Sequence, residues 1–290
     1  MSSRFRTVAL IGKYASPDTR DSLERLGRFL ESRQINVVLV RHTAEITGLN
    51  DWPTALLTDL GGIADLAIVI GGDGTMLNIA RGLGATGVPL VGVNRGRLGF
   101  LTDVSVDTML DTVGEILDGE FIEESRILLN AEIRRGDRCL EDACAFNDVV
   151  VSKSFTGRLI EFEIYVDRQF VYSQRADGVV VATPTGSTAY ALSAGGPILH
   201  PTLDAFALVP ICPHTLSARP IAVNGASTVE IIVTFAEDPR VHFDGQRHLD
   251  LAVGDRVVVQ RGPKPVHLLH PVGHSYYDTL RQKLHWGEKL

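Results

Sequence analysis

The feature that most constrains the fold is an apolar run that ends in a glycine-rich turn. Leu66–Ile70 reads Leu-Ala-Ile-Val-Ile and is followed at once by Gly71-Gly-Asp-Gly-Thr75. A short continuous apolar run bounded by glycine predicts a buried strand of a parallel sheet. The apolar periodicity from Thr75 to Leu83 predicts a helix directly after the turn. We therefore expect a strand–turn–helix unit.

This turn combines the elements of an anion site with one carboxylate, that of Asp73. Glycine permits close approach of the backbone to a ligand, and the first N–H groups of a helix attract anions. We therefore predict that Gly71, Gly72, Gly74 and Thr75 bind phosphate. In the alternative interpretation, Asp73 only caps the helix that follows.

Strand and helix patterns alternate through the first part of the chain. Further apolar runs lie at Val8–Ile11, Val37–Val40 and Val88–Val93, and apolar residues recur at helical spacing in Val106–Leu117. Continuous apolar strands separated by amphipathic helices predict a parallel sheet with helices on both faces. We expect a Rossmann-like α/β domain over residues 1–122.

The pattern changes in the second part of the chain. Segments such as Leu159–Val166 and Val229–Phe235 alternate polar and apolar residues. This alternation is typical of antiparallel strands with one buried face. We expect a β-sandwich-like domain over residues 123–269, and a C-terminal segment, residues 270–290, whose helix returns to the first domain.

Composition and charge argue against several classes of partner. Apolar residues make up 44% of the 290 residues and charged residues 22%, as in folded rather than disordered proteins. The 28 Lys and Arg against 35 Asp and Glu give a net charge of −7, which does not attract nucleic acid or an acidic membrane. No apolar stretch approaches the roughly 20 residues of a membrane span. We expect neither nucleic acid nor a membrane as a partner.

The N-terminal residues and the cysteines indicate the cytoplasm. The chain leads directly into Thr7–Ile11 without the apolar segment of a secretion signal. Cys139, Cys144 and Cys212 are odd in number and lack zinc-site spacing. We expect reduced, mostly buried thiols in a cytoplasmic protein.

A second glycine-rich turn, Gly92–Phe100, follows the next predicted strand. The carboxyl ends of neighbouring parallel strands line one crevice, so this turn is expected to face the same crevice as Asp73. Arg95 and Arg97 are candidates for binding phosphate there, and Asn94 for bracing the turn. Alternatively, the two arginines are solvated loop residues.

Two short polar motifs lie in β-like surroundings. Asn147 and Asp148 together donate and accept hydrogen bonds and so suit a ribose diol, although Asn-Asp is also common in turns. The segment Phe243-Asp-Gly-Gln246 predicts a hairpin turn.

The longest polar motif runs from Arg175 to Gly196. Its small residues let a ligand lie close to the backbone, and Thr188 and Ser193 supply hydroxyl groups for directed hydrogen bonds. Helix capping is the alternative explanation, and it accounts for only part of a run this long.

Several common site motifs are absent from the sequence. There is no Gly-x-x-x-x-Gly-Lys-Ser/Thr loop, no Gly-x-Gly-x-x-Gly opening the first helix and no His-Glu-x-x-His. None of the nine histidines forms a metal-ligand or triad pattern, so His200, His214, His248 and His274 are interpreted as ordinary partly buried or turn residues. No protein metal site is predicted.

Taken in order along the chain, these motifs resemble those of the bacterial NAD kinases (the ATP-NAD kinase family). The resemblance covers nearly the whole chain and rests on Gly71–Thr75, Gly92–Asp103, Asn147-Asp148, Asp177-Gly178, Thr183–Tyr190 and Pro213–Pro220. Gly-Gly-Asp-Gly-Thr alone is shared with diacylglycerol and sphingosine kinases and phosphofructokinases. Thr-Pro-Thr-Gly-Ser-Thr-Ala-Tyr in register with it is highly specific.

The resemblance implies an activity and its cofactors. Members of the family phosphorylate the adenosine ribose 2′-hydroxyl of NAD, using ATP or another phosphoryl donor and a divalent metal, usually Mg²⁺. They form homodimers or homotetramers. A metal held chiefly by donor phosphates and water agrees with the lack of a protein ligand set.

The resemblance also assigns roles to residues. Asp73 is implied to be the general base, with Gly74 beside it. The other residues implied to bind NAD are Asn147, Asp148, Arg158, Arg175, Asp177, Thr188, Ala189, Tyr190, Ala191, Leu192, Ser193 and Gln246. Many family members carry Glu at the position of Asp148, so the shorter acid changes the reach of that contact.

Two other functions remain open at this stage. A lipid kinase of the diacylglycerol type uses the same Gly-Gly-Asp-Gly-Thr turn, but the acidic chain and its lack of an amphipathic membrane helix argue against it. A non-catalytic nucleotide sensor would bind the same ligands without turnover, and it would not need the carboxylate of Asp73.

Overall fold

The structure is a computed structural model that describes residues 4–12, 17–96, 98–154 and 158–287. The chain divides into two compact units, residues 1–125 with 266–290, and residues 126–265. The boundaries expected from the sequence lie a few residues away, at 122/123 and 269/270.

The first unit is an α/β domain around one sheet. Its elements are β1 (Thr7–Gly12), α1 (Pro17–Ser32), β2 (Asn36–Val40), α2 (Arg41–Thr47), β3 (Thr54–Ala55), the 3-10 helix η1 (Leu57–Gly62), β4 (Leu66–Ile70), α3 (Asp73–Leu83), β5 (Leu90–Asn94), β6 (Val104–Ser105), α4 (Met109–Leu117), β7 (Phe121–Arg126), β20 (Val266–Pro271) and α6 (Tyr276–Leu284). The strand order is β3-β2-β1-β4-β5-β20-β7, with β6 beside β5. Strand β20 thus brings the C-terminal part of the chain into the sheet of the N-terminal part.

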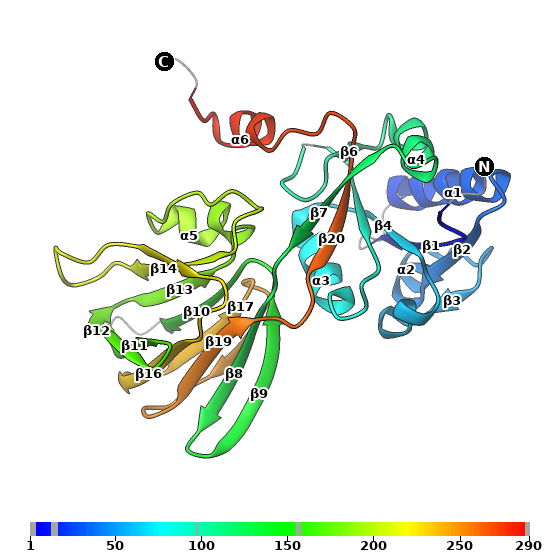
Figure 1. The fold of residues 1–290 in the computed structure, drawn as a ribbon. Coiled ribbons are helices and arrows are strands. Elements are labelled where there is room, and N and C mark those ends of the chain that lie inside the picture. Colours follow the sequence, from blue (N-terminus) through cyan, green and yellow to red (C-terminus); the bar gives the residue numbers. More distant parts are fainter. Residues whose placement is uncertain (1–3, 13–16, 97, 155–157, 288–290) are drawn as a thin grey trace. The chain divides into compact units, whose positions relative to one another are not determined.

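Helices cover both faces of this sheet, as the continuous apolar strands predict. Every residue of β4 and β5 is buried, and helices α1 and α4 pack on one face while α3 lies on the other (Figure 1). Helix α3 begins at Asp73, two residues before the predicted start, and its N-cap residue is Gly72. Asp73 is therefore the first helical residue, and the interpretation as a simple cap is wrong.

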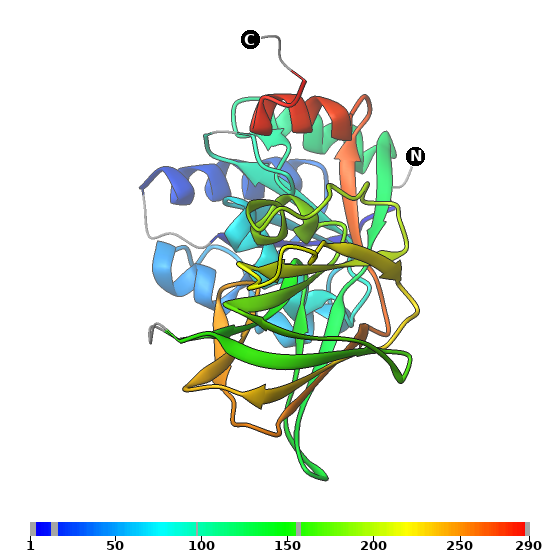
Figure 2. The ribbon, with the colours of Figure 1, turned by 90° about the vertical axis from the view of Figure 1, so that its left-hand side faces the viewer.

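The second unit consists of two antiparallel sheets. Its elements are β8 (Leu129–Arg135), β9 (Arg138–Ala145), β10 (Asp148–Lys153), β11 (Ile160–Val166), β12 (Gln169–Ala176), β13 (Gly178–Ala182), the 3-10 helix η2 (Gly186–Thr188), α5 (Tyr190–Ser193), β14 (Ala205–Ile211), β15 (Ile221–Asn224), β16 (Val229–Phe235), β17 (Pro239–Phe243), β18 (Arg247–Asp250) and β19 (Arg256–Arg261). The strand orders are β15-β14-β13-β10-β17-β18 and β12-β11-β16-β19-β8-β9. The β8–β9 hairpin extends beyond the other strands of this unit in both views (Figures 1 and 2).

The core of the second unit lies between the two sheets. Alternate residues of β10 and β17, such as Val149, Val151 and Val241, meet Phe162 and Ile231 of the other sheet. This alternation of buried and exposed residues confirms the predicted β-sandwich-like domain and the α/β + β fold class.

Two further observations bear on the expected cellular setting. No helix of the described residues is long and apolar enough to cross a membrane. The expectation of mostly buried thiols is wrong, because Cys139 and Cys212 are exposed and Cys144 is half-buried. Cys139 lies near the start of edge strand β9, and Cys212 follows the end of β14.

Candidate active site

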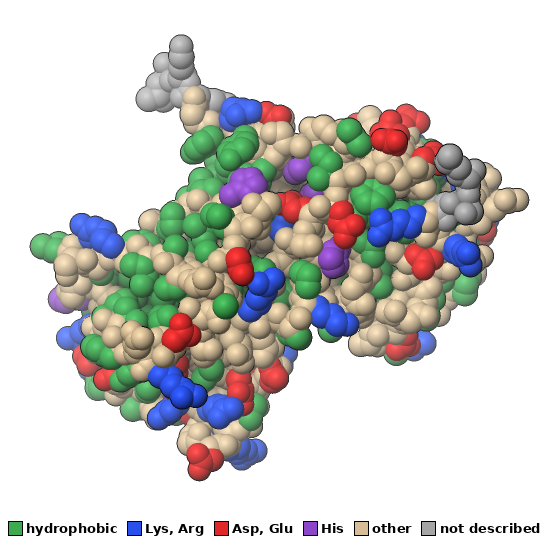
Figure 3. Space-filling model, in the orientation of Figure 1, with side chains coloured by type: hydrophobic (Ala, Val, Ile, Leu, Met, Phe, Trp, Pro, Cys, Tyr) green, Lys and Arg blue, Asp and Glu red, His purple; other side chains and the backbone are tan. Residues whose placement is uncertain are grey.

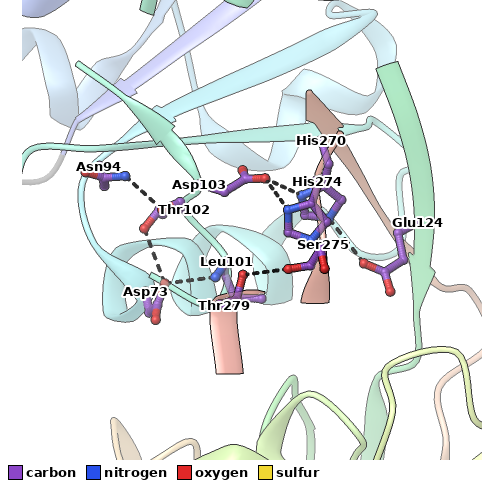
Figure 4. A network of polar contacts seen from close by, with 10 residues as sticks. All are labelled: Asp73, Asn94, Leu101, Thr102, Asp103, Glu124, His270, His274, Ser275 and Thr279. Carbon is purple, nitrogen blue, oxygen red and sulfur yellow. Dashed lines mark hydrogen bonds and ion pairs between the residues drawn. The ribbon is translucent and has the colours of Figure 1, made fainter. Parts of the chain in front are cut away.

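The carboxylate of Asp73 is held by the glycine-rich turn that follows β5. The backbone N–H of Phe100 donates to Oδ2 at 2.9 Å, and that of Leu101 donates to Oδ1 at 3.0 Å. The hydroxyl of Thr102 donates to Oδ1 at 3.3 Å (Figure 4). β4 and β5 are neighbouring parallel strands, so the turns at their carboxyl ends lie at the same edge of the sheet. The two turns therefore meet, as predicted.

The turn itself is tightly folded around Thr102. The carbonyl oxygen of Thr102 accepts the side-chain N–H of Asn94 and the backbone N–H of Gly99, both at 3.0 Å. A Cβ atom on Gly99 would lie 2.1 Å from Oδ1 of Asp73, so only glycine leaves room for the carboxylate. The predicted bracing role of Asn94 is confirmed.

Four of the five predicted phosphate-binding residues flank Asp73 in the chain, and the fifth, Arg95, directly follows β5. Gly71 and Gly72 join β4 to α3, while Gly74 and Thr75 belong to the first turn of α3. Arg95 donates from Nη1 to Oγ1 of Thr19 at 2.6 Å. Its contact with phosphate stays a prediction, and Arg97 lies outside the described residues.

A pocket of about 370 Å³ lies in the second unit and contains several predicted NAD-binding residues. It is lined by Asn147, Asp148, Val150, Ser152, Ala189, Tyr190, His242, Asp244 and Gly245. Asn147, Asp148, Ala189 and Tyr190 come from the prediction. These two predicted segments are about forty residues apart along the chain, and both line the same pocket.

Asp244 organises the segment that carries Asn147 and Asp148. Its Oδ1 accepts backbone N–H groups from Phe146, Asn147 and Asp148 at 3.0, 2.7 and 3.1 Å. Its own N–H donates to the carbonyl oxygen of Asp148 at 3.0 Å. Asp244 and Gly245 have φ values of 51° and 62°, which suits the predicted hairpin between β17 and β18.

Burial changes the protonation of Asp148. The side chain is buried, and desolvation together with the neighbouring Asp244 carboxylate raises the pKa of Asp148 to about 7. A carboxyl group with this pKa exists in both protonation states near neutral pH. In its protonated form the group can donate as well as accept a hydrogen bond.

The Thr-Pro-Thr-Gly segment packs against the same residues. The hydroxyl of Thr183 donates to the carbonyl oxygen of Phe146 at 2.7 Å and accepts the N–H of Gly186 at 3.0 Å. A Cβ atom on Gly186 would lie 2.1 Å from the carbonyl oxygen of Asn147. Glycine is thus required at position 186 by close backbone packing behind the pocket.

Two family models match the chain, and together they span both units. The ATP-NAD kinase N-terminal domain matches residues 8–121, and the ATP-NAD kinase C-terminal domain matches residues 146–271.

The chain belongs to the ATP-NAD kinase family.

Individual relatives agree with this assignment. The chain is 60% identical to an NAD kinase of Thiobacillus denitrificans and 52% identical to one of Chromobacterium violaceum, over the full length of both chains in each case. Among solved structures it is similar to yeast NADH kinase complexed with NADH, with a TM-score of 0.89 and 25% identity, covering 98% of this chain and 89% of that one. An NAD kinase from Archaeoglobus fulgidus in complex with ATP has a TM-score of 0.72 and 26% identity, covering 94% of this chain and 96% of that one.

Other residues implied by the likeness to NAD kinases lie outside the lining of the pocket. Arg158 pairs with Glu237, the guanidinium of Arg175 lies 3.8 Å from Glu161, and Asp177 lies 2.6 Å from Nζ of Lys153. Thr188 belongs to η2, Gln246 lies in the β17–β18 hairpin, and Ala191, Leu192 and Ser193 belong to α5. Their contacts with NAD stay predictions.

Sequence reasoning missed Asp244, His242 and Ser152 in this member of the ATP-NAD kinase family. Asp244 was contained in the predicted hairpin motif, but its partners lie almost one hundred residues earlier. The available signal was an Asp-Gly pair in a turn, where a short carboxylate often binds backbone N–H groups. His242 and Ser152 carry no such signal, since their place in the pocket follows only from the pairing of β10 with β17.

Proposed function

We propose that this protein transfers the γ-phosphoryl group of ATP to the 2′-hydroxyl of the adenosine ribose of NAD, yielding NADP and ADP. The observation that carries the proposal is the Asp73 carboxylate, fixed at the start of α3 by three donors from residues 100–102. Membership of the ATP-NAD kinase family and the solved complexes of relatives with NADH and ATP support it.

Asp73 acts as the proton acceptor in this proposal. The 2′-hydroxyl oxygen forms a bond to the γ-phosphorus, the bond between that phosphorus and the leaving oxygen of ADP breaks, and the hydroxyl proton passes to the carboxylate. Two carboxylate oxygens offer about four acceptor positions, and the turn occupies three of them. The remaining position is available for the substrate hydroxyl, while Gly71, Gly72, Gly74, Thr75 and Arg95 bind phosphate oxygens.

The pocket of the second unit binds the dinucleotide in this proposal. Asn147 and Asp148 bind ribose hydroxyls, and Ala189 and Tyr190 contact the adenosine. Support comes from the mixed polar and aromatic lining and from the rigid attachment of residues 146–148 to Asp244 and Thr183. The remaining proposed NAD contacts are those of Arg158, Arg175, Asp177, Thr188, Ala191, Leu192, Ser193 and Gln246.

We further propose that Mg²⁺ enters with ATP, bound by phosphate oxygens and water. Within the described residues, one group of three side chains has the spacing of metal ligands: Asp103, His270 and His274. Two of the three are imidazoles, which do not suit Mg²⁺. When bound, Mg²⁺ neutralises the charge that develops on the phosphates. The protein contributes positioning of the two substrates and a proton acceptor.

A product assay tests the proposal and its alternatives. The protein is incubated with Mg²⁺, ATP and NAD, and NADP is measured enzymatically, with parallel reactions that contain a diacylglycerol in place of NAD. We expect NADP and no phosphorylated lipid. Binding of NAD by calorimetry without any product would contradict the proposal and favour a nucleotide sensor. Replacement of ATP by polyphosphate identifies the donors that the enzyme accepts.

We also propose that the protein is a cytoplasmic homo-oligomer. Large apolar side chains are exposed on the second unit, among them Phe170, Leu203, Leu216 and Ile221, and Figure 3 shows hydrophobic side chains at the surface of this unit. Such side chains are typical of surfaces that a partner covers, and the three free cysteines suit a reducing compartment. Light scattering after size-exclusion chromatography would contradict the oligomer if it returned the 31.5 kDa monomer.

A further inference from the structure

A buried cluster of two histidines and two carboxylates lies next to the turn that holds Asp73, within the first unit. Nδ1 of His270 and Nδ1 of His274 lie 2.8 and 2.9 Å from the same oxygen of Asp103, Oδ2. On its other side, Nε2 of His270 lies 3.2 Å from Oε2 of Glu124 on β7 (Figure 4). The side chain of His270 is only 2% exposed and that of Asp103 only 7%. His274 lies partly buried between β20 and α6, in agreement with its interpretation as a partly buried or turn residue.

The distances in this cluster fit hydrogen bonds rather than ligation of one ion. Nitrogen and oxygen ligands of a tetrahedral zinc ion, with bonds of about 2.0–2.1 Å, lie about 3.3 Å from one another. The separations of 2.8 and 2.9 Å are those of charge-assisted N–H···O bonds. The two imidazole rings also stack, with centroids 4.1 Å apart and planes 14° from parallel.

Asp103 directly follows the residues that bind the catalytic candidate. Thr102 donates its hydroxyl to Asp73, and the N–H groups of Leu101 and Phe100 complete the contact. Burial raises the pKa of Asp103, but the hydrogen bonds and charges of His270 and His274 outweigh that effect and leave it well below its usual value. The carboxylate thus stays charged and bound at its end of the turn.

We propose that His270 and His274 are positioning residues for the phosphoryl transfer. By holding Asp103, they fix residues 100–102 and hence the orientation of the Asp73 carboxylate. His270 follows Asp103 by 167 residues in the sequence. In this proposal the C-terminal segment therefore takes part in catalysis without touching the substrate. This proposal rests on the proposed role of Asp73 as proton acceptor.

Two substitutions at one position separate this role from a merely structural one. In His270→Asn, the side-chain amide nitrogen takes approximately the place of Nδ1 and still donates to Asp103. In His270→Gln, it takes approximately the place of Nε2 and retains only the contact with Glu124. We expect kcat of H270Q to fall by about 10-fold to 100-fold, because small displacements of a catalytic group have effects of this size. The KM values for NAD and ATP should stay near those of the wild type, and H270N should retain most of kcat.

A matched control exists on the same strand. His267 of β20 also pairs with a carboxylate, that of Glu123 at 2.9 Å, but is partly exposed and not in contact with Asp103 in the described structure. We expect His267→Gln to leave kcat unchanged. If H270Q does not fold, His274→Gln carries the same test, because its ring is less buried.

Hydrogen exchange gives a readout that does not depend on activity. Without substrate, we expect the amides of Phe100 and Leu101 to exchange faster in H270Q than in the wild type, in H270N or in H267Q. Unchanged exchange of these amides, or equal kcat values for H270N and H270Q, would overturn the proposal. Stoichiometric binding of Zn²⁺ or Co²⁺ that H274Q abolishes would overturn it as well. A wild type that makes no NADP would instead contradict the proposed function, while the exchange data would still decide the positioning role.

Discussion

Asp148 and Asp244 line one pocket, and the backbone N–H of Asp148 donates to the carboxylate of Asp244 at 3.1 Å. Three backbone N–H groups donate to the carboxylate of Asp244, which lies close to the buried side chain of Asp148. Burial first, and this neighbouring charge second, raise the pKa of Asp148 from 3.8 to about 7. Asp148 therefore keeps its proton in the folded protein at mildly acidic pH.

The raised pKa of Asp148 predicts a specific pH dependence of stability. Between about pH 4 and pH 7 the unfolded chain ionises Asp148 while the folded protein keeps its proton. The folded state then binds more protons, so the free energy of unfolding falls as the pH rises, by up to about 1.4 kcal/mol per pH unit. Below about pH 4 this contribution is fully present, and above about pH 7 it is lost.

Asp148→Asn removes this titration and keeps the shape of the neutral acid. From about pH 5 to about pH 8, we expect the free energy of unfolding of the variant to rise by about 2 kcal/mol or more relative to that of the wild type. Urea unfolding of both proteins at the two pH values measures the difference, and titrations shared by the two proteins cancel. A difference that does not change with pH would contradict the assignment.

Replacement of Asp73 by Asn tests the proton acceptor. The N–H of Phe100 binds Oδ2 and that of Leu101 binds Oδ1, so the amide keeps an oxygen for only one of them, and it is not a base. We expect kcat to fall by about 100-fold to 10,000-fold, the usual contribution of general base catalysis, with NAD affinity largely intact. Steady-state kinetics and calorimetry with NAD measure the two effects.

The control for this variant is Asp65→Asn. Asp65 also accepts two backbone N–H groups, those of Arg6 and Thr7, but at the opposite end of β4. Both N–H groups bind the same oxygen, Oδ2, so the amide at position 65 can accept both, and we expect this variant to leave kcat unchanged. Near-full turnover by Asp73→Asn would remove Asp73 from the mechanism.

The sequence predicted those parts of the fold and site that depend on local patterns. Continuous apolar runs identified β4 and β5, and alternation identified strands such as β11 and β16. The position of Asp73 at the carboxyl end of a parallel strand followed from the glycine turn.

Contacts between distant segments were not predictable in this way. The clustering of His270 with Asp103 depends on β20 joining the sheet beside β5 and β7. The contact of Asp244 with Asn147 depends on the pairing of β17 with β10. Periodicity in the sequence identifies a strand and its buried face, but it does not identify the strand with which it pairs.

Gly99→Ala is expected to disturb Asp73 directly. The new Cβ atom would lie 2.1 Å from Oδ1 of Asp73 and 2.4 Å from Oγ1 of Thr102, so the turn must move. We expect a loss of about 1–3 kcal/mol in the free energy of unfolding, as for overpacked sites, and a fall in kcat larger than the change in the KM for NAD. Gly62→Ala is the control, because its Cβ meets nothing within 4 Å. Equal kinetics for the two variants would show that the turn does not position the carboxylate.

Thr183→Val tests the support behind the NAD pocket. The substitution keeps the volume but leaves the carbonyl oxygen of Phe146 and the N–H of Gly186 without the buried hydroxyl that joins them. Unsatisfied buried groups cost about 1–3 kcal/mol, so we expect a loss of stability of that size. Because Phe146 precedes Asn147, the KM for NAD should rise while the KM for ATP changes little. Thr58→Val, at an exposed position of η1, is the matched control, and an unchanged KM for NAD in Thr183→Val would show that Asn147 is positioned without this hydroxyl.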